Sequence, residues 1–170
     1  LSIPTMTDRA MQTLYRFALE PVAEVTADHN SFGFRPGRCV QDALEHCFTN
    51  LARETSPMWV LEGDIKGCFD NISHEWILKN IPMDKTILRQ FLKSGYVESG
   101  QLFPTEFGTP QGGTISTVIC NMVLDGIEPM LKLHFPRRWK NGRTYNPKVH
   151  FIRYADDFIV TGETPEILTG

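Results

Sequence analysis

The stretch Val149-His-Phe-Ile-Arg-Tyr-Ala-Asp-Asp-Phe-Ile-Val-Thr161 decides the fold class. Its two flanks are rich in β-branched and aromatic residues, which favour strands. We therefore predict a β-hairpin with strands at 149–154 and 158–161, and with Asp156 and Asp157 at its tip. Adjacent carboxylates without a counter-charge raise the free energy of the folded state, so the tip is a candidate cation site.

A third acid ends another predicted strand. Residues 58–65 read Met-Trp-Val-Leu-Glu-Gly-Asp-Ile, a short and bulky run that predicts a buried strand ending near Asp64. If this strand joins the hairpin in one sheet, Asp64, Asp156 and Asp157 form an all-oxygen site, which selects Mg²⁺ or Mn²⁺ over zinc. Two such ions about 3.5 to 4 Å apart are the usual device for in-line phosphoryl displacement.

The remaining segments carry helix and turn signals without a regular strand–helix–strand alternation, so the predicted class is α+β. A first helix begins at Thr7 or Asp8, has Met11, Leu14 and Phe17 on its core face, and is kinked or ended by Pro21. The later segments are a turn-rich stretch at 28–38, helices at 40–51, after Ser73 and at 85–94, short strands and turns at 96–110, and a helix opened by Gly112 and disturbed at Pro129.

Composition sets the broad class. The chain has 170 residues, of which 41% are hydrophobic, which suits one compact unit. It contains neither a run near the roughly 18 apolar residues of a membrane span nor a secretory signal at residue 1. We expect no membrane partner, and buried thiols in a reducing compartment at Cys39, Cys47, Cys68 and Cys120. The five histidines lack metal-ligand spacing.

Charge is unevenly distributed along the chain. The formal net charge is −3, although proteins that bind nucleic acid usually carry a basic excess. Residues 137–148 nevertheless contain no acid, and they include two aromatic residues and five basic ones: Arg137, Arg138, Lys140, Arg143 and Lys148. Two interpretations remain open, a phosphate-contacting loop with stacking surfaces and a solvated loop between two elements.

Ordered motifs then resemble one enzyme family. Tyr154-Ala155-Asp156-Asp157 resembles the Y-x-D-D hairpin of reverse transcriptases, Gly63–Ile72 resembles their motif A, and Gly108–Gly113 resembles motif B. Upstream, Ile3–Arg9 and Phe32–Gly37 resemble the fingers blocks of group II intron reverse transcriptases. The matches occur in the family's order and span nearly the whole chain.

The resemblance implies a fold, an activity and partners. The fold would be a reverse-transcriptase palm, with an antiparallel sheet backed by helices, plus partial fingers. The fingers would occupy about 1–57 and the palm about 58–170, with a fingers-side excursion near 73–110; the thumb, maturase and endonuclease regions of relatives are absent from these residues. The implied activity is RNA-directed DNA polymerase, acting on an RNA template, a DNA primer and dNTP, with group II intron RNA as a further partner. We expect a bacterial cytoplasmic protein, or an organellar one in a eukaryote.

The resemblance also implies residue roles. Asp64, Asp156 and Asp157 would be catalytic and hold two Mg²⁺ ions, with Mn²⁺ as a possible substitute and the Ile65 carbonyl as a further ligand. The implied nucleotide-binding residues are Ile65, Phe69, Gln111 and Gly112, and the implied template-binding residues are Arg35, Pro36 and Gly37. Phe69 by itself is also typical of a core residue, and Asp70 more often caps a turn than binds metal.

Other functional classes remain open. A non-catalytic RNA-binding maturase would have the same fold, but loss of Asp64 or Asp156 would be its signature, and both are present. The isolated chain is also expected to be an inactive truncation of an active protein. Retron, diversity-generating and CRISPR-associated reverse transcriptases share the Y-x-D-D core.

Overall fold

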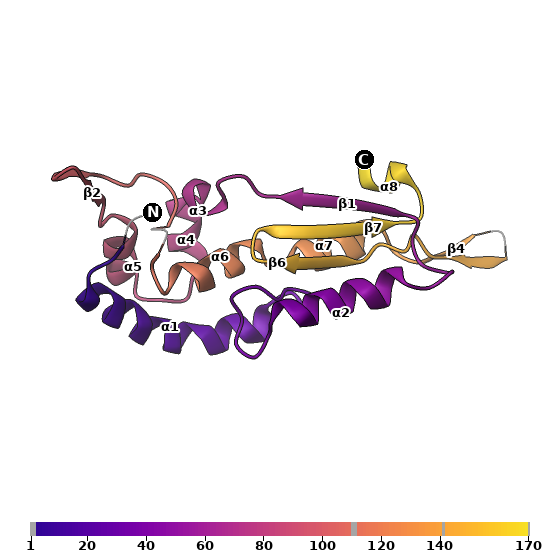
Figure 1. Ribbon diagram of the computed structural model, residues 1–170, viewed down its shortest axis with the longest axis horizontal. Helices are drawn as coiled ribbons and strands as arrows, with labels where there is room; N and C mark the ends of the chain where they lie inside the picture. Colours follow the sequence, from indigo (N-terminus) through magenta and orange to yellow (C-terminus); the bar gives the residue numbers. More distant parts are fainter. Residues whose placement is uncertain (1–2, 110–111, 141, 170) are drawn as a thin grey trace. The chain divides into compact units, whose positions relative to one another are not determined.

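The computed structural model describes residues 3–109, 112–140 and 142–169, which fold into two compact units. The first unit comprises Leu1–Thr26 and Lys66–Leu124, and the second comprises Ala27–Ile65 and Asp125–Gly170 (Figure 1). Each unit is therefore assembled from two separate segments of the chain. The predicted division into fingers and palm is a functional one, which these units do not test.

The second unit is organised around a three-stranded antiparallel sheet. Strand β7 (Asp157–Gly162) lies between β1 (Trp59–Asp64) and β6 (Phe151–Tyr154), as Figure 1 shows. Helix α2 (Val40–Leu51) packs on β6, and α8 (Pro165–Thr169) packs on β7 and β1. The predicted hairpin and the antiparallel, helix-backed sheet of an α+β fold are confirmed.

The expectation that β1 is buried is wrong. Trp59, Val60 and Leu61 are 48%, 47% and 40% exposed. The physical reason is topology, because β1 is an edge strand that pairs only with β7 in the three-stranded sheet. Bulky composition alone does not distinguish an edge strand from a central one.

The helix predicted to run from Gly112 past Pro129 is in fact two helices. Helix α6 (Ser116–Leu124) belongs to the first unit and α7 (Ile127–His134) to the second. Gly126 separates them with a φ of +105°, a backbone conformation that glycine adopts without strain. Pro129 is tolerated in the first turn of α7, where an N–H group has no intrahelical partner in any case. The break therefore comes from Gly126, and Pro129 causes no disturbance.

The first unit consists mainly of helices. They are α1 (Met6–Thr26), α3 (Cys68–Asn71), α4 (His74–Asn80), α5 (Lys85–Leu92) and α6, with a hairpin of β2 (Tyr96–Glu98) and β3 (Gln101–Phe103). Ser73 caps α4 as predicted, and Asp84 caps α5 by accepting hydrogen bonds from two backbone N–H groups. The core is aliphatic, and its most deeply buried members are Ile77, Ile81, Leu88, Leu92, Ile115 and Ile119.

Helix α1 differs from the prediction in its length and in its buried face. It continues through Pro21 to Thr26. Pro21 is exposed, so water can hydrate the carbonyl that loses its N–H partner. The predicted core face at Leu14 and Phe17 is 63% and 66% exposed, and the buried stripe instead consists of Gln12, Leu19 and Ala23.

The four cysteines differ in burial. Cys68 and Cys120 are buried in the first unit with their Sγ atoms 3.6 Å apart, and Cys47 is half-buried. Cys39 is exposed, which corrects the prediction that all four are buried. Among the described residues, no helix is both long and apolar enough to cross a membrane.

Candidate active site

The sheet of the second unit brings the predicted catalytic acids to one end. Asp64, the last residue of β1, is the cross-strand partner of Asp157, the first residue of β7. Asp157 also pairs with Tyr154 on β6, so Asp156 lies in the two-residue turn between them. Residues directly opposite each other in an antiparallel pair project to the same face. The register therefore places two carboxylates side by side and the third next to them in the chain.

The turn that carries Asp156 has an unusual backbone. Ala155 has a φ of +58°, a region that residues with a Cβ rarely occupy. The Ile65 N–H donates to the Asp156 carbonyl at 3.4 Å, which joins the end of β1 to the turn. Local strain of this kind persists where the surrounding structure determines the conformation.

No ion pair neutralises Asp64, Asp156 or Asp157 within the part of the chain that the structure describes. Asp64 and Asp157 are exposed and Asp156 is half-buried. Residues 3–109, 112–140 and 142–169 do not by themselves gather three acidic, histidine or cysteine side chains into a metal-binding group. The donor set is nevertheless all-oxygen and uncompensated, which fits hard cations whose remaining ligands come from elsewhere.

An open cavity of about 630 Å³ lies beside these acids in the second unit. Glu62, Asp64, Tyr154 and Asp157 line it from the sheet. From α2 it is lined by apolar side chains, namely Val40, Ala43, Leu44 and Cys47. The cavity thus offers space with an apolar wall next to the carboxylates.

The first unit holds the predicted nucleotide-binding segments together. Phe69 on α3 is half-buried, and its carbonyl accepts a hydrogen bond from the Thr109 N–H at 2.8 Å. The Gly108 N–H donates to the Ile72 carbonyl at 2.8 Å, and the His74 ring bonds to the Gly108 carbonyl at 2.7 Å. These hydrogen bonds therefore hold the end of motif A next to the start of motif B.

The two other predicted nucleotide-binding residues in this unit belong to motif B. Gly112 is exposed and has a φ of +102°. Gln111 lies outside the described residues. The helix after them begins at Ser116, later than Gly112-Gly113 predicted, so this glycine pair belongs to a turn.

The predicted template loop places its three residues differently. Arg35 is 9% exposed, and its Nη1 donates to the carbonyls of Asp28 and Ser31, both at 2.9 Å. Pro36 and Gly37 are exposed. The observed bonds give Arg35 a role inside the loop, and a template contact by the loop stays a prediction.

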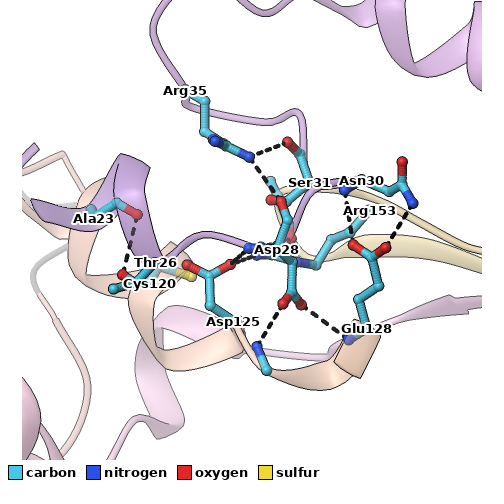
Figure 2. Close-up of polar contacts among 12 residues, drawn as sticks. Ala23, Thr26, Asp28, Asn30, Ser31, Arg35, Cys120, Asp125, Glu128 and Arg153 are labelled. Atoms are coloured by element: carbon cyan, nitrogen blue, oxygen red, sulfur yellow. Dashed lines mark hydrogen bonds and ion pairs between the residues drawn. The ribbon is translucent and has the colours of Figure 1, made fainter. Parts of the chain in front are cut away.

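Sequence reasoning missed a buried polar cluster next to the turn that carries Asp156, which Figure 2 shows. The Asp28 carboxylate accepts from the N–H groups of Gly126 at 2.9 Å and Glu128 at 3.1 Å, so it caps the start of α7. The Asp28 N–H in turn donates to Asp125 Oδ1 at 3.2 Å, and Arg153 Nη2 donates to the same oxygen at 2.8 Å. The only local signal was a charged residue, Arg153, inside an apolar strand.

The acids of this cluster are electrostatically different. Burial raises the pKa of Asp125, against the opposing effects of the Asp28 N–H and the Arg153 charge. Burial acts in the same direction on Glu128, but hydrogen bonds from Lys132 and Asn30 outweigh it and lower the pKa of that carboxyl. Glu128 accepts two bonds from Asn30, at 3.0 Å from the backbone and 2.9 Å from the side chain.

The basic segment forms a β-hairpin of β4 (Arg138–Lys140) and β5 (Arg143–Tyr145), where the sequence had predicted a loop. Arg137 and Arg138 are exposed, and Trp139 is 75% exposed. Burial, aided by the Arg137 charge, lowers the pKa of nearby His150. Among the described side chains of this segment, the exposed positive charge is carried by Arg137 and Arg138.

Comparison with known proteins assigns this arrangement to a family. The family described as "Reverse transcriptase (RNA-dependent DNA polymerase)" matches residues 1–170. The chain belongs to the reverse transcriptase family. The resemblance drawn from its ordered motifs is thereby confirmed.

Relatives of this reverse transcriptase chain include proteins encoded by group II introns. It is 39% identical over 148 residues to "Group II intron-encoded protein LtrA" of Lactococcus lactis subsp. cremoris, covering 81% of this chain and 24% of LtrA. It is 30% identical over 188 residues to "Protein YkfC" of Escherichia coli K12, covering 94% of this chain and 49% of YkfC. The chain thus spans about a quarter to a half of these relatives.

A solved structure supports the fold. An apo telomerase from Candida tropicalis, truncated from its C-terminal domain, matches with a TM-score of 0.50 and 15% identity. The match covers 96% of this chain and 35% of the telomerase chain. At this identity the likeness concerns the fold alone.

The contact between motifs A and B generates a first prediction. A Cβ on Gly108 would lie 2.4 Å from the Phe69 carbonyl oxygen and 2.7 Å from the Asp70 Cα, whereas a Cβ on Gly100 meets nothing within 4 Å. Both glycines have a φ of +79°. Gly100→Ala is expected to lower the free energy of unfolding by about 1 to 2 kcal/mol through backbone strain alone, and Gly108→Ala by clearly more. Urea unfolding monitored by circular dichroism measures both, and equal losses would contradict the proposed close contact.

Proposed function

We propose that this chain is the catalytic core of an RNA-directed DNA polymerase. The observation that carries the proposal is the register of Asp64 opposite Asp157, with Asp156 in the adjoining turn, in a member of the reverse transcriptase family. In the proposed reaction, a primer 3′-hydroxyl attacks the α-phosphate of a dNTP and pyrophosphate leaves. The RNA template selects the dNTP by base pairing.

The proposed metal ligands are the three aspartates and the Ile65 carbonyl. They would hold two Mg²⁺ ions, or Mn²⁺ in their place, because the donors are all hard oxygens and no cationic side chain among the described residues neutralises the acids. Bound divalent ions at such sites lower the pKa of an attacking hydroxyl and stabilise the charge of the transferring phosphoryl group. The aspartates would supply negative charge and a fixed position.

The proposed nucleotide site uses residues of motifs A and B. Phe69 would contact the sugar of the incoming dNTP and exclude a 2′-hydroxyl by steric overlap. Gln111 would lie beside the nucleotide, and Gly112 would let the backbone approach it without a Cβ. The hydrogen bond from the Thr109 N–H to the Phe69 carbonyl supports this proposal, since it fixes the Phe69 segment next to motif B.

The template and the intron are the proposed nucleic-acid partners. The exposed residues Pro36 and Gly37 would lie along the template, with Arg35 supporting the loop from inside. The intron-encoded relatives favour group II intron RNA as a second partner and a role in splicing and mobility. An assay of intron splicing with and without the protein tests this role, and the absence of any effect would remove it.

The catalytic proposal makes a direct prediction. Asp156→Ala is expected to lower Mg²⁺-dependent dNTP incorporation on an RNA template and DNA primer by at least about a hundredfold, because one metal-binding oxygen pair is lost. The assay uses the natural reading frame that contains residues 1–170. Glu98→Gln, which removes an exposed carboxylate on β2, is the control and should retain activity.

Two outcomes would contradict this assignment. Incorporation that survives Asp156→Ala would show that the aspartate is not a metal ligand. A wild-type protein that binds RNA and promotes splicing, yet incorporates no nucleotide, would favour the non-catalytic maturase.

The proposed role of Phe69 predicts a change in substrate choice. Phe69→Val is expected to lower the discrimination against ribonucleotides, measured as the ratio of kcat/KM for dNTP and rNTP, by at least about tenfold because the steric barrier is removed. Phe91→Val is the matched control, since Phe91 is a half-buried ring of the same unit that contacts Tyr15. If both variants lose stability and neither changes the ratio, Phe69 is a core residue.

We further propose that the β4–β5 hairpin binds RNA phosphates, with Trp139 as a stacking surface. Arg137→Gln with Arg138→Gln should reduce the slope of log K against log salt by about 1.4, since each phosphate contact to a single strand contributes about 0.7. Trp139→Ala should weaken binding by about 1 to 3 kcal/mol without changing that slope.

Filter binding of a single-stranded RNA over a range of salt concentrations measures both quantities. The charge-matched control is Lys79→Gln with Lys93→Gln, two exposed cations of the first unit. If the slope of log K against log salt is equal for the two double variants, the hairpin does not bind RNA phosphates and is only a solvated connection between two elements.

A further inference from the structure

Arg153 connects the catalytic turn to a buried polar cluster. Its side chain is fully buried within the second unit, where Nη1 donates to the Ala155 carbonyl at 3.0 Å and Nη2 donates to Asp125 at 2.8 Å. Ala155 is the residue of the turn with a positive φ. One guanidinium therefore joins the strained residue to an acid just before α7, as Figure 2 shows for Arg153 and Asp125.

The loop before α2 forms backbone hydrogen bonds with Arg153. The Arg153 N–H donates to the Asn30 carbonyl at 2.9 Å, and the Phe32 N–H donates to the Arg153 carbonyl at 2.8 Å. Ser31 and Arg153 form a parallel bridge, so the loop adds to the outer edge of β6. Glu128 fixes Asn30 and Asp28 caps α7, which ties this loop to the same helix start.

The same loop lies directly against the turn. A Cβ built on Gly33 would lie 2.2 Å from the Ala155 nitrogen and 2.9 Å from its Cα. The φ of Gly33 is not in the left-handed region, so the requirement for glycine here is one of space. Backbone therefore packs on backbone where the chain turns between Tyr154 and Asp157.

We propose that Arg153, Asp125 and Gly33 are positioning residues that fix the Ala155-Asp156 turn, so that Asp156 and Asp157 present their oxygens to the catalytic metal ions. The inference rests on the proposed metal-dependent function. A turn with a left-handed alanine keeps its conformation only if its surroundings impose it. Here the conformation of Ala155 is imposed by the hydrogen bond from Arg153 to its carbonyl and by the close packing of Gly33 against its backbone nitrogen. None of the three positioning residues is a proposed metal ligand.

The test uses Arg153→Lys and Gly33→Ala in the natural reading frame that contains residues 1–170. Arg153→Lys keeps the charge beside Asp125 but cannot reach both partners with a fork of donors. Gly33→Ala leaves the guanidinium intact and places a Cβ against the Ala155 backbone. Arg38→Lys is the matched control, because Arg38 belongs to the same loop and its Nη1 donates to the His29 and Ser31 carbonyls.

Two readouts separate positioning from general structure. Mn²⁺ binding is followed by electron paramagnetic resonance without turnover, and the Mg²⁺ dependence of single-nucleotide incorporation gives kcat and the KM for dNTP. Both variants should weaken Mn²⁺ binding and lower kcat by about 10- to 100-fold, with the KM for dNTP little changed, as expected when supports of metal ligands are altered. Arg38→Lys should match wild type, and circular dichroism verifies folding.

The outcomes distinguish this inference from the proposed function. If wild type shows no Mn²⁺ binding that Asp156→Ala abolishes, the metal site itself is refuted. If that binding exists and folded Arg153→Lys and Gly33→Ala proteins retain it, only the positioning role is overturned. Loss of folding in both variants would also overturn it, because the cluster would then support the unit as a whole.

Discussion

The pairing of β7 with both of its neighbours is the constraint on which the site depends. Asp157 is opposite Asp64 on one side and Tyr154 on the other. A slip of one residue in either pairing would turn the side chains to the other face of the sheet. The register must therefore be enforced against the repulsion between two carboxylates that it brings together. Close packing enforces it, since a Cβ on Gly63 would lie 2.4 Å from the Phe158 ring across the same strand pair.

The buried polar cluster contacts the turn between β6 and β7, at a considerable cost of desolvation. A buried ion pair is weak evidence for stability, because removing the charges from water offsets much of their attraction. Removing one partner alone typically costs about 3 to 5 kcal/mol, since the other charge is left uncompensated. Arg153 and Asp125 therefore favour one arrangement of the turn strongly over alternatives, whatever their net contribution to stability. That specificity suits a turn which has to hold an alanine at a φ of +58°.

Local signals in the sequence predicted the elements that carry the acids of the candidate site. Two runs rich in β-branched and aromatic residues predicted β6 and β7, and Ser73 marked the start of α4, because these features depend on neighbours in the chain. The exposed face of α1 could not be predicted, since helical spacing reveals an apolar stripe and not what packs on it.

Long-range contacts were beyond sequence reasoning for a different physical reason. Asp28 meets Glu128 across 100 residues, and no spacing rule links them. The family resemblance placed Arg35 on the template, whereas in the structure its guanidinium donates to the buried carbonyls of Asp28 and Ser31. The side chain that satisfies a buried backbone group is determined by the tertiary fold. The same limit hid the close approach of Gly33 to Ala155.

The distribution of charge is compatible with the proposed polyanionic substrate. The net charge is −3, and three of its acids are the uncompensated aspartates of the candidate site. Divalent ions bound there would reverse the local sign and make the acids a means of attracting phosphate. Arginine and lysine of the β4–β5 hairpin would supply the metal-independent part of the attraction. Nucleic-acid binding at the carboxylates should therefore depend on divalent ions, which would bridge the acids and the phosphates. Binding at the hairpin should instead weaken as the monovalent salt concentration rises, because salt screens the attraction between basic side chains and phosphates.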